Sequence, residues 1–300
     1  MRKIKIRLPA TVTNLGPGLD SLGLAIGLYT TVEISGREDN KLEITLLGEG
    51  ADTFDTPLKH PVVRAISRFF QHIEKTKIGI TIRVDNNIPL NSGLGAETAF
   101  AVAGTLGANN LMGDLYNREE TLELAASISR PDGAVSALMG GLGAGVIQDD
   151  LLIHRTLPVK PFQVVVVVPQ IDNYAPPTLP EQLSRKDALH NMARIPLMID
   201  ALREADMRLL ARVLDDPVLT PRLTAQISGF GHVAELGGRR GALKVIPCGG
   251  GPALMALAES HHDRIADEMR LAFKSAGIEA RAWVLPVDTQ GVVISLTQSV

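Results

Sequence analysis

Residues 87–99 read NIPLNSGLGAETA, a glycine turn that follows a β-rich run and opens an apolar helical pattern. Gly93 and Gly95 let the backbone bend tightly and bring consecutive N–H groups together. The start of the helix that we expect at residue 96 adds a partial positive charge. The segment therefore predicts a cradle for an anion. For a Gly-x-Gly taken alone, an ordinary strand-to-helix turn is the alternative.

The elements on both sides of this turn place the chain in a mixed α and β class. Before residue 150, we expect strands at 3–8, 30–35, 42–47, 78–84 and 146–148 and helices at 61–74, 96–111 and 121–129. A second series of strands and helices begins with a strand at residues 162–168, whose unbroken valines indicate burial on both faces. Helices at 186–203, 207–214, 228–236 and 261–276 and strands at 243–246, 280–285 and 291–296 follow. We expect two domains, residues 1–155 and 156–300.

Composition excludes several classes of partner. The 300 residues, 45% of them hydrophobic, suffice for one large or two modest cores. The net charge of −3 is spread along the chain, so we expect neither a nucleic acid nor a membrane surface as partner. No run approaches the ~20 apolar residues of a membrane span, and residues 1–10 lack the apolar core of an export signal. The single cysteine, Cys248, excludes an internal disulfide and fits a reducing, cytoplasmic location.

Two further segments accompany the turn: PATVTNLGPGLDSLG at residues 9–23 and CGGGPA at residues 248–253. Together with the run Arg185-Lys186-Asp187-Ala188, Asn191 and Arg194, they resemble the superfamily of galactokinase, homoserine kinase, mevalonate kinase and phosphomevalonate kinase (GHMP kinases), and homoserine kinase most closely. The resemblance covers almost the whole chain. It implies an α+β fold with a domain like ribosomal protein S5, a ferredoxin-like second domain, an active site in the cleft between them, and a homodimer.

The resemblance also implies where ligands bind. ATP phosphates are expected on the second and third segments, at Pro89, Ser92, Gly93, Leu94, Gly95, Ala96, Thr98, Gly249, Gly250 and Gly251. Homoserine is expected near Asn14, Asp20, Arg130 and the helix that carries Arg185, Asn191 and Arg194. Arginine offers paired donors to a substrate carboxylate, but structural salt bridges are the alternative for Arg185 and Arg194.

The chain departs from the homoserine kinase pattern at positions that serve ATP and Mg²⁺. Ala96 and Glu97 stand where the family has two small hydroxyl residues, one of which helps to ligate Mg²⁺. A carboxylate suits the first turn of a helix but repels a triphosphate unless a metal lies between them. Glu97 is therefore a replacement metal ligand, an acid or base, or a helix-start residue without a catalytic role. The family's magnesium-binding Glu falls on Ala126 or Ser127, so Glu123, one turn earlier, is the second metal candidate.

Residues expected to contact the substrate and the adenine also depart from the homoserine kinase pattern. The family's His-x-Asp-Asn segment appears as Arg130-Pro131-Asp132-Gly133, in which only the Asp is kept. His60 takes the place of an adenine-side Asn, and Leu223 that of an Arg. Because these substitutions fall in one expected cleft, they suggest changed chemistry or a changed substrate.

Three functions remain open. The first is a kinase that uses ATP and Mg²⁺ to phosphorylate the hydroxyl of homoserine or a related small amino or hydroxy acid. The second is an isomerase, lyase or hydrolase on the same scaffold that needs neither cofactor, and the third is an inactive binding protein. The catalytic candidates are Glu97, Asp132 and Asp20. Simpler explanations hold for His261 to Asp263, as a solvated polar cluster, and for Cys248, as a small buried residue.

Overall fold

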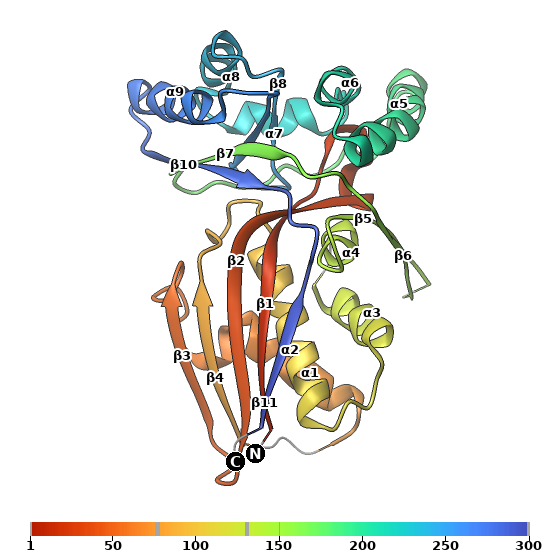
Figure 1. Cartoon of the computed structure of the whole chain (residues 1–300), viewed down its shortest axis with the longest axis vertical. Helices are drawn as coiled ribbons and strands as arrows, with labels where there is room; N and C mark the ends of the chain where they lie inside the picture. Colours follow the sequence, from red (N-terminus) through yellow and green to blue (C-terminus); the bar gives the residue numbers. More distant parts are fainter. Residues whose placement is uncertain (1, 76–78, 130–131, 150, 299–300) are drawn as a thin grey trace.

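The computed structural model describes residues 2–75, 79–129, 132–149 and 151–298 (Figure 1). Within them, the larger sheet has the strand order β11-β1-β2-β4-β3, and a branch on which β5 pairs with β2 and β6 with β5. These strands are β1 (Arg2–Val12), β2 (Leu22–Arg37), β3 (Leu42–Gly48), β4 (Gly79–Asn86), β5 (Leu142–Gln148), β6 (Leu151–Leu157) and β11 (Val293–Gln298). All pairings are antiparallel except that of β3 with β4. The long strand β2 therefore joins the main sheet to the β5–β6 branch.

Four helices accompany this sheet: α1 (Pro61–His72), α2 (Ala96–Leu111), α3 (Arg118–Ser129) and α4 (Asp132–Ala137). α1 is amphipathic and buries Val62, Ile66, Phe69 and Phe70 on one side. α2 is apolar all round, and it is buried almost throughout because it packs against α1, α3 and β1. This packing holds the start of α2 in a fixed place beside the end of β1.

The smaller sheet has the order β10-β7-β9-β8, with every pairing antiparallel. Its strands are β7 (Gln163–Pro169), β8 (Lys244–Pro247), β9 (Leu254–Leu257) and β10 (Ala280–Pro286), and its helices are α5 (Arg185–Glu204), α6 (Met207–Val213), α7 (Thr220–Gln226), α8 (Phe230–Arg239) and α9 (His262–Ser275). Val165 and Val167 face a core shared with α8 and α9, while Val164 and Val166 face the larger core. The predicted burial of this strand on both faces is confirmed.

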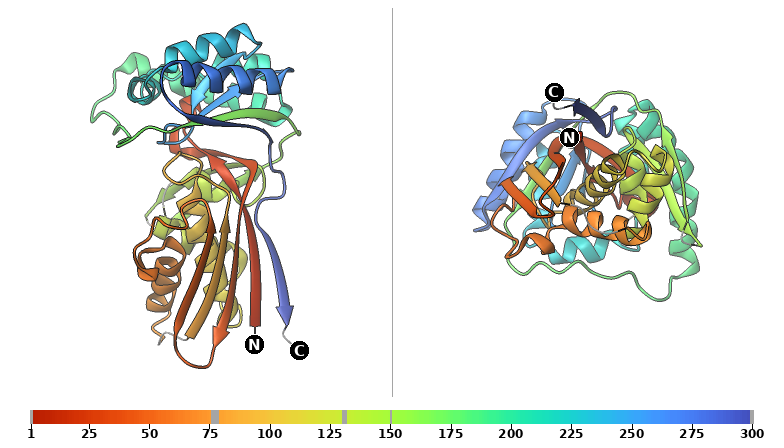
Figure 2. Two further views of the ribbon diagram at one scale, coloured as in Figure 1. Left: turned by 90° about the vertical axis from the view of Figure 1, so that its left-hand side faces the viewer. Right: turned by 90° about the horizontal axis from the view of Figure 1, so that it is seen from below.

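The end of the chain returns from the smaller sheet to the larger one. After β10, residues 287–292 cross between the sheets, and β11 then pairs with β1, so that both termini lie at one end of the molecule (Figure 2). The last strand of the chain therefore belongs to the same sheet as the first strand. The division into domains near residue 155 stays a prediction.

Most predicted elements are found, with shifted ends. The helix predicted at 96–111 agrees with α2 at both ends. β2 begins at Leu22, well before the predicted residue 30, because its first five residues are all buried and show no alternation. β6 and the short helices α4 and α7 were not predicted, since α4 and α7 span only six and seven residues and show too little periodicity.

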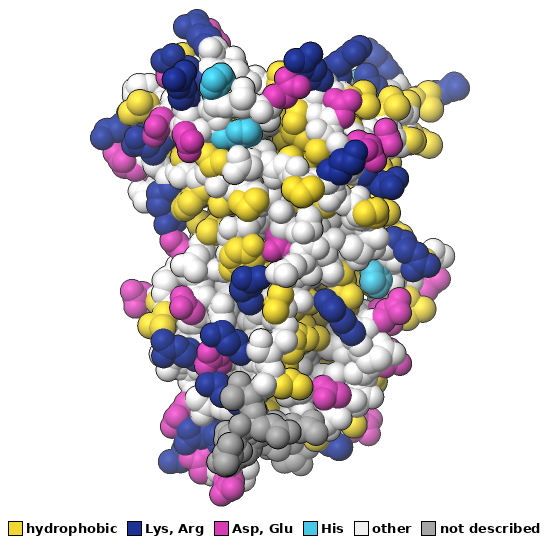
Figure 3. All heavy atoms as spheres, in the orientation of Figure 1, with side chains coloured by type: hydrophobic (Ala, Val, Ile, Leu, Met, Phe, Trp, Pro, Cys, Tyr) yellow, Lys and Arg dark blue, Asp and Glu magenta, His cyan; other side chains and the backbone are white. Residues whose placement is uncertain are grey.

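On the face drawn in Figure 3, Lys and Arg side chains are interspersed with Asp and Glu over both halves of the molecule. Among the helices of the described residues, none is long and apolar enough to cross a membrane.

Candidate functional site

The three glycine-containing segments meet through backbone hydrogen bonds. At the end of β1, the Thr11 N–H donates to the Leu94 carbonyl at 3.1 Å. The Ala253 N–H donates to the Ser92 carbonyl at 3.0 Å, and the Gly249 N–H donates to the Thr13 carbonyl at 2.9 Å. The second and third segments follow the first by about 80 and 240 residues in sequence, and these hydrogen bonds join all three.

Glycine is required where the second and third segments touch. A Cβ atom at Gly93 would lie 2.0 Å from the Cys248 carbonyl oxygen, and one at Gly251 would lie 2.0 Å from the Ser92 carbonyl carbon. Gly93 also has a φ of +88°, a conformation that side chains disfavour. The close approach of two backbones therefore explains these glycines without reference to a ligand.

The turn itself is held by Ser92. Its buried hydroxyl donates to the Pro89 carbonyl at 2.7 Å and accepts from the Leu94 N–H at 3.3 Å. Ser92 was predicted to bind the cofactor, and both of these bonds stay within the turn. The hydroxyl fixes the shape of the cradle.

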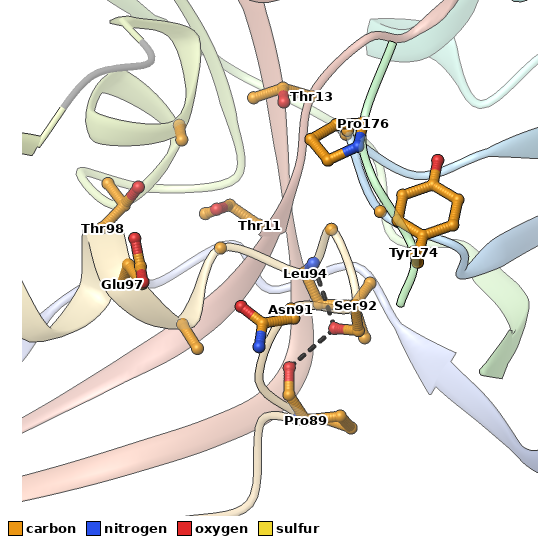
Figure 4. A pocket seen from close by; sticks show the side chains of 17 residues that line it. Thr11, Thr13, Pro89, Asn91, Ser92, Leu94, Glu97, Thr98, Tyr174 and Pro176 are labelled. Carbon is orange, nitrogen blue, oxygen red and sulfur yellow. Dashed lines mark hydrogen bonds between the residues drawn. The ribbon is translucent and has the colours of Figure 1, made fainter. Parts of the chain in front are cut away.

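The start of α2 forms one wall of a cavity of about 310 Å³ (Figure 4). Gly95 is the N-cap residue, with a φ of 73°, and as a glycine it has no side chain to cap the helix. The first-turn N–H groups of a helix have no acceptor within it, so they are available to a ligand. The cavity is lined by Thr11, Thr13, Pro89, Asn91, Ser92, Gly93, Leu94, Gly95, Ala96, Glu97, Thr98, Ala134, Tyr174, Pro176, Gly249, Gly250 and Gly251.

A second cavity of about 670 Å³ adjoins the first, and Thr13 and Gly250 line both. Its other lining residues are Asn14, Asp20, Ile147, Pro177, Thr178, Leu179, Leu219 and Leu223. The proline-rich loop at 176–180 contributes to both cavities. We call the first the phosphate cavity and the second the acceptor cavity.

The structure brings together most of the predicted site. All ten residues predicted to bind the cofactor line the phosphate cavity, and so does Glu97. Asn14 and Asp20 line the acceptor cavity. Asn14 is buried, and its Oδ1 has no hydrogen-bond partner among the described residues. An unpartnered buried amide oxygen is costly, so a ligand in this cavity that donates a hydrogen bond to it is favoured.

The predicted residues of α5 lie elsewhere in this structure. Neither cavity is lined by Arg185, Asn191 or Arg194. The Arg194 guanidinium donates to the His190 carbonyl of its own helix at 3.1 Å, and Arg185 is exposed. The Asn191 amide donates to Asp216 Oδ1 at 2.7 Å. The Asp216 carboxylate also accepts three backbone N–H groups and so orders the start of α7. A role in substrate binding stays a prediction for these three residues.

The remaining site predictions concern α3 and α4. Glu123 is half-buried on α3 and does not line either cavity. Arg130 lies outside the described residues, and Asp132 is the first residue of α4, which lines the phosphate cavity through Ala134. Their roles stay predictions.

Glu97 is the only acidic residue among the described ones that line the phosphate cavity. It lies in the first turn of α2 and is exposed to solvent. Over the described residues, no group of three or more His, Cys, Asp or Glu side chains could hold a metal ion alone. A metal in this cavity would need oxygen ligands from a bound molecule beside Glu97.

Two further substitutions have structural explanations. His60 does not line the phosphate cavity; its Nδ1 accepts the Val62 N–H at 3.2 Å and caps α1. Burial between Phe54 and Phe100 lowers the pKa of His60 to about 4. Leu223 does line the acceptor cavity, where it adds an apolar wall in place of a cation.

Sequence reasoning missed four polar residues of the phosphate cavity: Thr11, Thr13, Asn91 and Tyr174. Thr11 lies on β1 and Thr13 directly follows the end of that strand, so the polar residues at 11 and 13 were the available signal. Burial raises the pKa of the Tyr174 hydroxyl, which has no partner among the described residues. Tyr174 follows β7 in a long loop, and no local pattern places that loop over the glycine turn.

Comparisons with known proteins show which family the chain is similar to. Residues 60–141 match the N-terminal domain of GHMP kinases. The chain is 31% identical to a homoserine kinase of Nostoc punctiforme over 96% of this chain and 97% of that protein. It is 28% identical to a homoserine kinase of Desulfitobacterium hafniense over 97% and 99% of the two chains. The crystal structure of a homoserine kinase from Cytophaga hutchinsonii matches with a TM-score of 0.80 and 26% identity, over 98% of this chain and 97% of that one. A mevalonate diphosphate decarboxylase from Staphylococcus aureus, 13% identical with a TM-score of 0.72 over 98% of each chain, shares the fold.

Proposed function

The chain belongs to the homoserine kinase family of GHMP-fold phosphotransferases, and from this membership we propose that it phosphorylates the hydroxyl of homoserine or of a related small amino or hydroxy acid with ATP. In this reaction the substrate oxygen bonds to the γ-phosphorus and the bond between that phosphorus and the bridging oxygen breaks. ADP and one proton leave. The observation that carries the proposal is that the uncapped start of α2 lines one cavity and that this cavity shares lining residues with a second one.

The phosphate cavity suits the phosphates of ATP. Gly93, Gly95 and Gly251 let the three segments pack closely around the start of α2. The first-turn N–H groups of α2, which have no acceptor within the helix, donate to anionic oxygens. The partial positive charge of the helix end adds to this attraction. These residues bind and orient the phosphoryl group, and positioning of this kind carries most of the catalysis in phosphoryl transfer.

Glu97 is the residue that we propose for Mg²⁺. This ion usually binds proteins through one or two carboxylates and completes its shell with water and substrate phosphates, so a single carboxylate at the cavity wall is enough. When bound, Mg²⁺ neutralises charge on the phosphate oxygens. It also relieves the repulsion that the Glu97 carboxylate would otherwise exert on them.

The acceptor cavity suits a small molecule that carries a hydroxyl and an ammonium group. Asn14 Oδ1 and the Asp20 carboxylate are both acceptors, and both line this cavity. Among its described lining residues, Asp20 is the only charged one. Thr13 and Gly250, which line both cavities, mark the place where the acceptor hydroxyl would face the phosphoryl group.

The proposal is tested by measuring ADP formation with the purified protein, ATP and Mg²⁺. We expect ADP release that depends on both homoserine and Mg²⁺, with one O-phosphohomoserine formed per ADP. Serine, threonine and 3-aminopropan-1-ol serve as comparison substrates. The last lacks the carboxylate and shows whether that group contributes to binding.

Two results would count against the proposal. A protein whose melting temperature stays unchanged in millimolar Mg-ATP does not bind the nucleotide, because a ligand of the folded state must stabilise it. A protein that binds Mg-ATP but transfers phosphate to none of the four hydroxyl compounds has a different acceptor class.

A further inference from the structure

Thr11 carries a buried hydroxyl without a hydrogen-bond partner among the described residues. Its side chain is only 2% exposed, near the end of β1. Buried hydroxyl groups in proteins are bonded in the large majority of cases, because an unpaired one loses its bonds to water. Such an exception at a cavity wall indicates a group that bonds to a ligand.

The position of Thr11 is fixed from two sides. Its N–H bonds to the Leu94 carbonyl, and its Oγ1 stands 2.0 Å from the point that a Cβ atom at Gly95 would occupy. The hydroxyl therefore lies against the N-cap of α2. In Figure 4 it points toward the side of the cavity on which Glu97 and Thr98 lie.

The chemistry of the unpartnered atoms separates the two cavities. Asn14 Oδ1 can only accept a hydrogen bond, so it suits an ammonium or hydroxyl group of the acceptor. Thr11 Oγ1 can also donate, and phosphate oxygens can only accept. Both residues lie at the end of β1, one at each cavity, so the same strand end presents an acceptor to the substrate and a donor to the phosphates.

We propose that the Thr11 hydroxyl donates a hydrogen bond to an oxygen of the phosphoryl group that is being transferred. The inference rests on the proposed kinase function and names a further residue for it. The N–H groups at the start of α2 and the Thr11 hydroxyl, which lies against the N-cap of this helix, hold the phosphoryl group together. Thr11 keeps its proton throughout, and its bond strengthens as charge develops on the phosphoryl oxygens.

This assignment makes Thr11 a side-chain hydrogen-bond donor to the phosphates, a role that residues 96 and 97 cannot perform. The side chain of Ala96 has no polar atom, and a carboxylate at residue 97 is a hydrogen-bond acceptor. Tyr174 also lines the cavity with an unpartnered hydroxyl, but it comes from a long loop and is only partly buried. Among these side chains, Thr11 combines a donor with a position fixed by the sheet.

The test compares Thr11→Val with Thr11→Ser. Valine has nearly the same shape and lacks only the hydroxyl, so kcat/KM for homoserine phosphorylation should fall by about 10- to 100-fold. The melting temperature of the free protein should stay the same or rise, because no bond is lost and an unpaired polar group is removed. Serine keeps the hydroxyl and should recover most of the rate.

Thr105→Val is the matched control. Thr105 is also fully buried, but its hydroxyl donates to the Ala101 carbonyl within α2 at 2.9 Å and lines neither cavity. This variant should lower the melting temperature and leave kcat/KM within about twofold, since its bond is structural.

The outcomes separate the two proposals. If the wild-type protein phosphorylates homoserine and Thr11→Val does so equally well, the inference about Thr11 is wrong and the kinase function stands. A Thr11→Val protein that is less stable and loses activity only in proportion to its folded fraction would show a structural hydroxyl, and would also overturn the inference. If the wild-type protein neither binds Mg-ATP nor turns over, the kinase proposal fails and the inference falls with it.

Discussion

His60 is a buried residue whose imidazole serves as the cap of α1 and packs between two aromatic rings. Because burial lowers its pKa from 6.5 to about 4, the unfolded chain takes up a proton first as the pH falls. The contribution of neutral, buried His60 to the free energy of unfolding is complete above about pH 6.5 and is lost progressively as the pH falls toward 4. The loss amounts to about 3 kcal/mol of unfolding free energy.

Urea unfolding at pH 7.5 and pH 4.5 measures this effect. His60→Asn keeps a side chain that can cap a helix but cannot titrate, so its unfolding free energy should depend less on pH in this range. His232→Asn, on the exposed surface of α8, should keep the wild-type dependence. Equal pH dependence in wild type and His60→Asn would show that His60 is not the titrating group.

At the scale of elements, the contact between two glycine turns decides whether the site exists. Gly251→Ala would place a methyl group 2.0 Å from the Ser92 carbonyl carbon, so the third segment would have to move away from the second. We expect a loss of more than about 2 kcal/mol of unfolding free energy and no stabilisation by Mg-ATP. Thermal unfolding with and without Mg-ATP measures both effects.

Gly238→Ala is the control for this prediction. Nothing lies within 4 Å of a Cβ atom at Gly238, which is in α8. Alanine there should stabilise the protein by about 0.5–1 kcal/mol and leave nucleotide binding unchanged. If Gly251→Ala behaved like Gly238→Ala, the two turns would not be in close contact.

At the scale of the whole molecule, the crossing segment 287–292 ties the two sheets together. The buried Asp288 carboxylate accepts the Tyr29 hydroxyl at 2.9 Å and the N–H groups of Gln290 and Gly291 at 2.9 and 2.6 Å. The Asp288 N–H donates to the Ala25 carbonyl on β2 at 2.9 Å. One side chain thus fixes the return of the chain to the larger sheet.

Asp288→Ala should lower the unfolding free energy by about 2–4 kcal/mol, because it leaves buried donors without an acceptor. Tyr29→Phe removes only one of these bonds and should cost about 1 kcal/mol. Urea unfolding gives both values. A smaller loss for Asp288→Ala than for Tyr29→Phe would show that the segment is held by other contacts. The homodimer stays a prediction that sedimentation can test.

The sequence by itself determined the glycine turn, the ends of α2 and the doubly buried strand β7. These features depend on local properties: glycine's access to positive φ, helical periodicity and an unbroken run of valines. The anion cradle at this turn was predicted from the same local properties, whereas the individual residues expected to contact ATP were implied by the resemblance to homoserine kinases.

Only the tertiary structure decided which distant groups meet. It left the Thr11 hydroxyl without a partner among the described residues and returned β11 to the sheet of β1. Each of these facts depends on contacts between segments that are far apart in the chain. Local propensity carries no information about such contacts, because they arise from how the buried faces of all the elements pack together.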